Sequence, residues 1–254
     1  DPENGTPRCP RLEHEVLQPV DPGQVVVDAV ALFKEAAPDF TFETWAVVDG
    51  EFPPSAEAAD GWLVTGSRHG VYDDLPWIDR LKDFMLEARA ARRPILGICF
   101  GHQIVAEAFG GRAVKSDRGW GLGLSEYRIT ARPGWMADAA DVIALNAIHQ
   151  DQVVGVPDDA TVLAESTHCP FAMLAYGDAE APDAVTIQPH PECAPNYTSD
   201  LAEILGADGR APAAIAEAAR AATGHDAALT PDARAFARWA TAFWRQAKAR
   251  AEAA

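Results

Sequence analysis

The stretch Pro94-Ile95-Leu96-Gly97-Ile98-Cys99-Phe100-Gly101-His102-Gln103 decides the fold of this chain. Its apolar run ends at a cysteine between two glycines, and a helical pattern of apolar residues follows at once, up to Gly110-Gly111. This order predicts a strand, a sharp turn and a helix, with Cys99 as a nucleophile at the turn. The start of the helix favours the thiolate form of such a cysteine. A buried structural cysteine at a strand end is the alternative interpretation.

A second apolar strand ends at a histidine further along the chain, in Ala184-Val185-Thr186-Ile187-Gln188-Pro189-His190-Pro191-Glu192. Glu192 follows His190 by two positions. A cysteine hydrolase needs a base that takes the thiol proton and a carboxylate that orients this base. We therefore predict a catalytic triad of Cys99, His190 and Glu192.

On these two motifs the chain resembles the class I glutamine amidotransferases. Gly97-Ile98-Cys99-Phe100-Gly101-His102-Gln103 is similar to the nucleophile motif of that family, and His190-Pro191-Glu192 to its His-Pro-Glu motif. The resemblance covers most of residues 24–205. It implies an α/β fold with a flavodoxin-like open sheet, mostly parallel and flanked by helices, that carries the nucleophile elbow.

The resemblance also implies roles for residues around the triad. The backbone N–H groups of Gly66 and Phe100 would form the oxyanion hole, although Thr65-Gly66-Ser67 alone is typical of an ordinary turn. Gln103, Gln150 and Asp151 would contact the amino-acid end of the substrate. The glycine-containing loop Trp120-Gly121-Leu122-Gly123 would line the pocket, or else form a plain hairpin. The chemistry needs no metal and no organic cofactor.

The composition fits an enzyme domain and excludes some partners. A net charge of −17 on 254 residues argues against nucleic acid or an anionic membrane, because both would repel the chain. No apolar window approaches the length of a membrane span, and no signal peptide is visible, although the chain begins at Asp1 without methionine. Reduced thiols and a cytoplasmic location are expected. The cysteines lack the spacing of a zinc site or a disulfide framework and are Cys9, Cys99, Cys169 and Cys193.

The order of elements predicts one domain over residues 24–205. Residues 1–23 are rich in proline and predict irregular chain, without the apolar strand that opens the domain in the resembled family. Either that strand precedes Asp1, or it lies in residues that the numbered sequence omits, or this edge of the fold is remodelled. Apolar periodicity predicts helices over 24–37, 75–93 and 201–205, and strands over 40–45, 61–64, 112–116, 123–130, 141–145, 161–164, 171–176 and 183–188.

Residues 206–254 form a predicted helical extension, rich in alanine and interrupted by Gly224 and Pro231. Its last helix carries a stripe that is too apolar to remain in water. The stripe must pack on the domain or on another subunit, which leaves a homodimer open. It consists of Phe236, Trp239, Ala240, Phe243 and Trp244.

The predicted function is hydrolysis of a γ-glutamyl amide bond, in glutamine or another γ-glutamyl compound, through a thioester on Cys99. Relatives in the resembled family include glutaminase subunits of synthetases and free-standing γ-glutamyl peptidases. The chain shows no phosphate-cradling glycine motif, so it acts alone or delivers ammonia to a separate synthetase partner. A redox sensor or a non-catalytic binding protein built on the same elbow would not need the pair His190 and Glu192.

Overall fold

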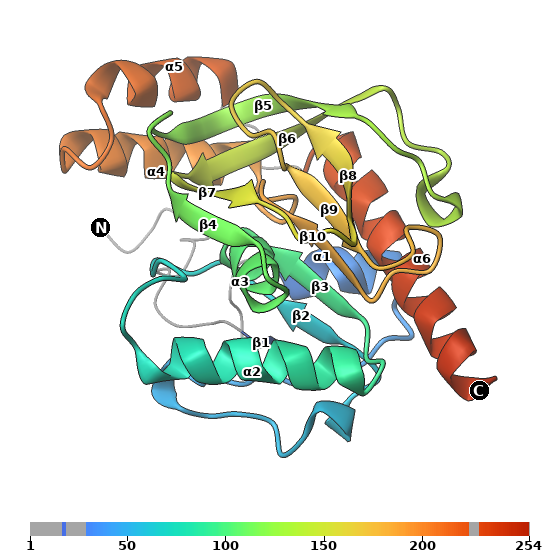
Figure 1. Ribbon diagram of the computed structural model, residues 1–254. Helices are drawn as coiled ribbons and strands as arrows, with labels where there is room; N and C mark the ends of the chain where they lie inside the picture. Colours follow the sequence, from blue (N-terminus) through green and yellow to red (C-terminus); the bar gives the residue numbers. More distant parts are fainter. Residues whose placement is uncertain (1–16, 19–28, 224–228, 254) are drawn as a thin grey trace, which may run out of the picture.

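The computed structural model describes residues 17–18, 29–223 and 229–253, and a mixed sheet of eight strands forms its centre (Figure 1). A two-stranded ribbon of β4 (Arg112–Lys115) and β7 (Asp151–Gly155) is separate from this sheet. In spatial order the strands of the sheet are β1 (Leu17–Gln18), β2 (Trp62–Val64), β3 (Ile95–Ile98), β10 (Ala184–Ile187), β9 (Met173–Tyr176), β8 (Ala160–Glu165), β5 (Gly121–Ile129) and β6 (Val142–His149).

The flavodoxin-like α/β class, with an open sheet flanked by helices, is confirmed, but the prediction of a mostly parallel sheet is wrong. Among the strands that the structure describes, β3 pairs in parallel with β2 and β10, and the other pairings in the large sheet are antiparallel. A parallel pair needs a long crossover, usually a helix. Between α3 (Phe100–Ala108) and α4 (Pro195–Ala207) the only helical element is a short 3₁₀ turn, η3 (Gly134–Met136). The strands of this segment, β4 to β10, therefore pair with one another in antiparallel fashion.

Two apolar layers cover the parallel strands, because successive side chains of a strand point to opposite faces. Trp62 and Val64 of β2 pack with α2 (Pro76–Ala90) and α3 on one face. Leu63 packs on the other face with α1 (Ala29–Ala36) and α6 (Pro231–Glu252) (Figure 1). Strands buried on both faces read as unbroken apolar runs, which is the pattern that the sequence shows here.

The long helix α6 is held on the sheet by its aromatic stripe. Phe236, Trp239, Phe243 and Trp244 are buried, and the Trp244 ring meets the edge of Phe33 from α1 at a centroid distance of 5.2 Å. Two further helices, α4 and α5 (Ala213–Thr223), precede it and lie against the β5 end of the sheet. No helix in the described part of the chain is both long and apolar enough to cross a membrane.

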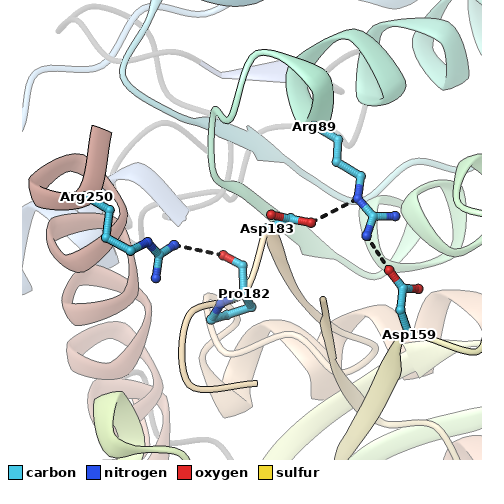
Figure 2. Close-up of polar contacts among 5 residues, drawn as sticks. All are labelled: Arg89, Asp159, Pro182, Asp183 and Arg250. Atoms are coloured by element: carbon cyan, nitrogen blue, oxygen red, sulfur yellow. Dashed lines mark hydrogen bonds and ion pairs between the residues drawn. The ribbon is translucent and has the colours of Figure 1, made fainter. Parts of the chain in front are cut away.

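Polar contacts tie the start of β10 to the helices on both sides of it (Figure 2). Arg89, near the end of α2, donates from Nε to Asp183 at 3.0 Å and forms a second ion pair with Asp159. Arg250 of α6 donates to the carbonyl oxygen of Pro182 at 3.3 Å. Because these contacts lie at the amino end of β10, they leave the carboxyl end of the parallel strands open for other residues.

Most of the predicted elements are present, but several differ from the prediction. The predicted strand over 40–45 is wrong: only Phe42 and Trp45 form isolated bridges, and Phe40 contacts Trp244 of α6 instead of lining a sheet. The strand β7 was not predicted, and α4 begins at Pro195, before the predicted 201–205. Two 3₁₀ turns, η1 (Val47–Asp49) and η2 (Ala56–Ala58), lie in the connection to β2.

The N-terminal predictions fall mostly outside the described residues. Within residues 1–23 the structure describes only β1, which pairs antiparallel with β2. This two-residue strand differs from the irregular chain predicted there. The helix predicted over 24–37 is present as α1 in its described part.

Candidate active site

Three loops meet at the carboxyl edge of the parallel strands. Because β2, β3 and β10 run parallel and adjacent, the residues that follow them lie at the same edge of the sheet. These residues are Gly66 after β2, Cys99 after β3 and His190 after β10. A Cβ atom built on Gly66 would lie 3.1 Å from Cε1 of His190 and 3.8 Å from Cβ of Cys99, so the three residues are direct neighbours.

Cys99 occupies a strained turn between β3 and α3. Its backbone angles are φ 54° and ψ −103°, in a region that residues with a side chain rarely adopt. Two glycines make the turn sterically possible: a Cβ on Gly97 would lie 2.5 Å from the carbonyl oxygen of Gly101, and a Cβ on Gly101 would lie 2.0 Å from that of Val64. The strain and the two glycines are the features of a nucleophile elbow.

His190 lies between the nucleophile and a carboxylate. Its Nδ1 is 2.6 Å from Oε1 of Glu192, and its side chain is hydrogen-bonded to the thiols of Cys193 and Cys99. Burial alone would lower the pKa of His190, but the negative charges of Glu192 and Cys99 outweigh this effect and raise the pKa well above its usual value. The imidazole is therefore held ready to carry a proton opposite the sulfur atom, and an imidazolium stabilises a thiolate.

A cavity of about 690 Å³ opens onto this edge of the sheet. Cys99, His190 and Glu192 lie in its wall, and α4 contributes Tyr197 and Leu201 on another side. The wall combines apolar surface with a few polar groups, which is typical of pockets for small molecules. The arrangement can bind a small substrate with its reacting carbon against the thiol.

The backbone N–H groups of Gly66 and Phe100 are available to bind an oxyanion. Phe100 is the first residue of α3, where N–H groups lack helical acceptors. Neither N–H donates to a backbone carbonyl of any residue that the structure describes. Both residues flank the nucleophile, Phe100 in sequence and Gly66 in space.

A family model for the class I glutamine amidotransferases matches residues 47–201, more than half of the chain. The protein belongs to this family. The matched span contains all three residues of the predicted triad.

Individual relatives in the family carry different names. The chain is 33% identical to γ-glutamyl peptidase 3 of Arabidopsis thaliana over 59% of this chain and 62% of the peptidase, which is less than two thirds of that relative. It is 31% identical to a subunit of the glutamine-hydrolysing GMP synthase of Halobacterium salinarum, over 58% of this chain and 74% of that relative.

Solved structures share the fold. A glutamine amidotransferase from Thermotoga maritima superposes with a TM-score of 0.66 over 87% of this chain and 93% of its own, at 19% identity. A glutamine amidotransferase from Methylobacillus flagellatus gives a TM-score of 0.65 over 90% and 93%, at 20% identity. At these identities the likeness concerns the fold.

The three residues predicted to contact the substrate all line the cavity, in different ways. Gln103 is buried in α3, and its Nε2 donates to the carbonyl oxygen of Asp151 at 3.0 Å and to Oε1 of Gln188 at 3.1 Å. Gln150 is half-buried in the turn between β6 and β7. The carboxylate of Asp151 accepts a hydrogen bond from the Tyr72 hydroxyl at 2.8 Å. Gln103 thus anchors the backbone on which Gln150 and Asp151 are presented.

Trp120 and His149 complete this side of the cavity. Gly121 begins β5, and β4 pairs with β7, so the loop at Trp120 is not a hairpin between β4 and β5. The His149 side chain is buried, and its Nδ1 is 3.2 Å from the carbonyl oxygen of Asp151. Burial lowers the pKa of His149 to about 3, so its ring is neutral.

His102 follows Cys99 closely in sequence but belongs to the interior. Its side chain is fully buried, its Nδ1 lies 2.7 Å from the hydroxyl of Thr186, and it is absent from the cavity wall. Burial lowers the pKa of His102 to about 3. A neutral histidine that is buried against β10 and lies outside the cavity wall is not placed to exchange protons with the thiol.

Sequence reasoning missed two residues that hold the His190 loop. The carbonyl oxygen of Asn146 accepts the His190 backbone N–H at 2.7 Å, and its Nδ2 donates to the carbonyl oxygen of Cys193 at 2.8 Å. An asparagine inside the apolar run Ala144–Ile148 was the available signal, since a buried amide needs partners. Cys193 was noted only as one of four scattered cysteines, although it directly follows Glu192.

Proposed function

We propose that this protein hydrolyses γ-glutamyl amide bonds, with Cys99 as the nucleophile and a γ-glutamyl thioester as the intermediate. One observation carries the proposal: a cysteine on a strained elbow is hydrogen-bonded to a histidine that is only 11% exposed and whose Nδ1 meets a carboxylate, and all three residues line one cavity. Membership in the amidotransferase family supports the same reaction type.

In the first half of the reaction the Cys99 sulfur attacks the side-chain carbonyl carbon of the γ-glutamyl group. His190 takes the thiol proton and passes it to the departing nitrogen, while Glu192 holds the ring in the required tautomer. The oxygen of the tetrahedral intermediate becomes negative and is bound by the N–H groups of Gly66 and Phe100. Removing one such donor typically costs about 10²–10³ in rate.

In the second half water replaces the amine. His190, again neutral, takes a proton from this water, which attacks the thioester carbon. The Cys99 thiolate leaves, and glutamate is released. Gln150 and Asp151 would contact the amino-acid end of the substrate, with Gln103 holding them in position.

The substrate proposed first is a γ-glutamyl peptide or amide cleaved by the chain alone. Support comes from the similarity to γ-glutamyl peptidases 3, 4 and 5 of Arabidopsis thaliana, at 29–33% identity. A glutaminase that delivers ammonia to a separate synthetase is the second candidate, and the similarity to GMP synthase subunits favours it. The two candidates share the triad and differ in the need for a partner.

A substrate screen of the purified chain separates the two candidates. Glutamine, γ-glutamyl dipeptides and glutathione conjugates are each incubated with the protein, and glutamate release is followed. Turnover of at least one γ-glutamyl peptide supports the free-standing hydrolase. If every substrate is inert while a glutamine-analogue alkylator still labels Cys99 stoichiometrically, the free-standing hydrolase is ruled out and the partner-dependent glutaminase takes its place. Failure to label Cys99 would contradict both.

A further inference from the structure

A second thiol lies beside the proposed catalytic pair. Cys193 is 4% exposed and lines the same cavity, and one ligand atom from each of His190, Glu192 and Cys193 lies within 4.8 Å of the other two. The tight turn after β10 brings them together: the Cys193 N–H donates to the carbonyl oxygen of His190 at 3.3 Å. Asn146 fixes the turn from β6.

The carboxylate in this group has spare capacity for a ligand. Oε1 of Glu192 is 2.6 Å from His190, but Oε2 is buried and has no hydrogen-bond partner among the described residues. Glu192 as a whole is 6% exposed. A buried carboxylate oxygen normally has a partner, because its desolvation is costly otherwise.

We propose that His190, Glu192 and Cys193 form a binding site for a soft divalent cation of the Zn²⁺ class. Thiolate, imidazole and carboxylate are the ligands that Zn²⁺ takes, with bond lengths of about 2.0–2.3 Å and tetrahedral geometry. Such bonds place ligand atoms about 3.3–3.8 Å apart, so the group closes on the ion by shifts of about 1 Å. Water takes the fourth position. Hard cations such as Mg²⁺ prefer six oxygen ligands and do not fit this set.

Bound metal would inhibit the hydrolysis. This inhibition rests on the proposed function, whereas metal binding itself does not. The ion displaces the Cys193 thiol proton and takes one nitrogen of His190. On Nδ1 it forces the remaining ring proton onto Nε2, the nitrogen left for the Cys99 thiol. On Nε2 it covers that nitrogen. In both cases His190 can no longer accept a proton, and acylation of Cys99 stops.

Direct metal binding tests the site without any substrate. Zn²⁺ affinity is measured by competition with a chromophoric chelator, and Co²⁺ is used to detect the absorption band of a thiolate bound to the metal. Cys193→Ser should abolish the band and weaken Zn²⁺ binding by at least the roughly 10–100-fold that loss of an outer-shell partner typically costs, because it removes a direct ligand. Cys99→Ala should keep both. Cys169→Ser is the matched control, because Cys169 is an equally buried thiol outside the group and burial raises its pKa to about 12.

Two results would overturn the site. One is loss of binding in Cys99→Ala with retention in Cys193→Ser, which would place the ion on the nucleophile instead. The other is failure of the wild-type protein to bind Zn²⁺ more tightly than Mg²⁺. Circular dichroism checks that Cys193→Ser is folded, and Cys193→Ala serves as a second variant if it is not. Inhibition is scored separately on the wild type and on the variants that keep Cys99, as the Zn²⁺ concentration that halves each protein's own rate. Binding without inhibition would leave the site intact and contradict the base role of His190.

Discussion

A methyl group added at Gly101 tests how closely α3, the helix that follows Cys99, approaches the strand β2. The new Cβ would lie 2.0 Å from the carbonyl oxygen of Val64 and 2.7 Å from its carbonyl carbon. An ordinary contact begins near 3.4 Å, so α3 and β2 must separate by about 1.4 Å. Crowding in a packed core costs about 1–3 kcal/mol. Because the obstacle is strand backbone and not a flexible side chain, we expect Gly101→Ala to lose about 3 kcal/mol of unfolding free energy.

Gly110→Ala is the matched control for this experiment. Gly110 follows the end of α3 and has φ 95°, but a Cβ there would meet nothing within 4 Å. Its cost comes from backbone conformation alone, about 1–2 kcal/mol. Unfolding free energies are measured with urea, and the labelling rate of Cys99 by a glutamine analogue is measured on the folded variants.

The two variants should also differ in reactivity. The Gly101 N–H donates to Thr65 at 3.1 Å, so separation of α3 from β2 also separates Gly66 from Phe100. Gly101→Ala should therefore label slowly, while Gly110→Ala labels at the wild-type rate. If Gly101→Ala proves no less stable than Gly110→Ala, the close approach of α3 to β2 is refuted.

Three further predictions concern the base, acid stability and helix α6. His190→Asn should lower the single-turnover acylation rate by about 10²–10⁴-fold, and His102→Asn by much less; the reverse ranking would reassign the base. Burial lowers the pKa of His102 to about 3, so this residue stays neutral in the folded protein but takes up a proton in the unfolded chain below about pH 6.5. The unfolding free energy should therefore fall as the pH is lowered from about 6.5 to about 3. His102→Gln should reduce the slope of unfolding free energy against pH in this range by about 1.4 kcal/mol per pH unit. Phe243→Ala should cost about 3–5 kcal/mol in urea denaturation, against about 0.5 or less for Ile204→Ala, since Phe243 is fully buried and Ile204 is 51% exposed.

The parallel centre of the fold could be predicted because its signals are local. Ile95–Ile98 and Ala184–Ile187 are short apolar runs that end at special residues, and strands buried on both faces leave this pattern in any sequence. Since the ends of adjacent parallel strands lie together, the neighbourhood of Cys99 and His190 followed from the same two runs.

Other features depend on contacts between distant parts of the chain. The alternation in residues 40–45 suits a strand, yet Phe40 packs on Trp244, about two hundred residues later, and no local pattern contains that contact. The antiparallel half of the sheet arises because the connections between its strands contain no α-helix. The prediction of a mostly parallel sheet came from the family resemblance and did not take these connections into account. The anchoring of His190 by Asn146 also joins distant segments of the chain, the loop after β10 and the strand β6.

The identity of the atom that carries the acyl group tests the proposed mechanism most directly. The protein is mixed with a γ-glutamyl substrate that it turns over, quenched in acid during the first turnover, digested and mapped by mass spectrometry. We predict one γ-glutamyl group on the peptide that contains Cys99, removable by hydroxylamine as expected for a thioester. A γ-glutamyl group on any other residue, or substrate turnover by Cys99→Ala above a few per cent of wild type, would contradict nucleophilic catalysis by Cys99.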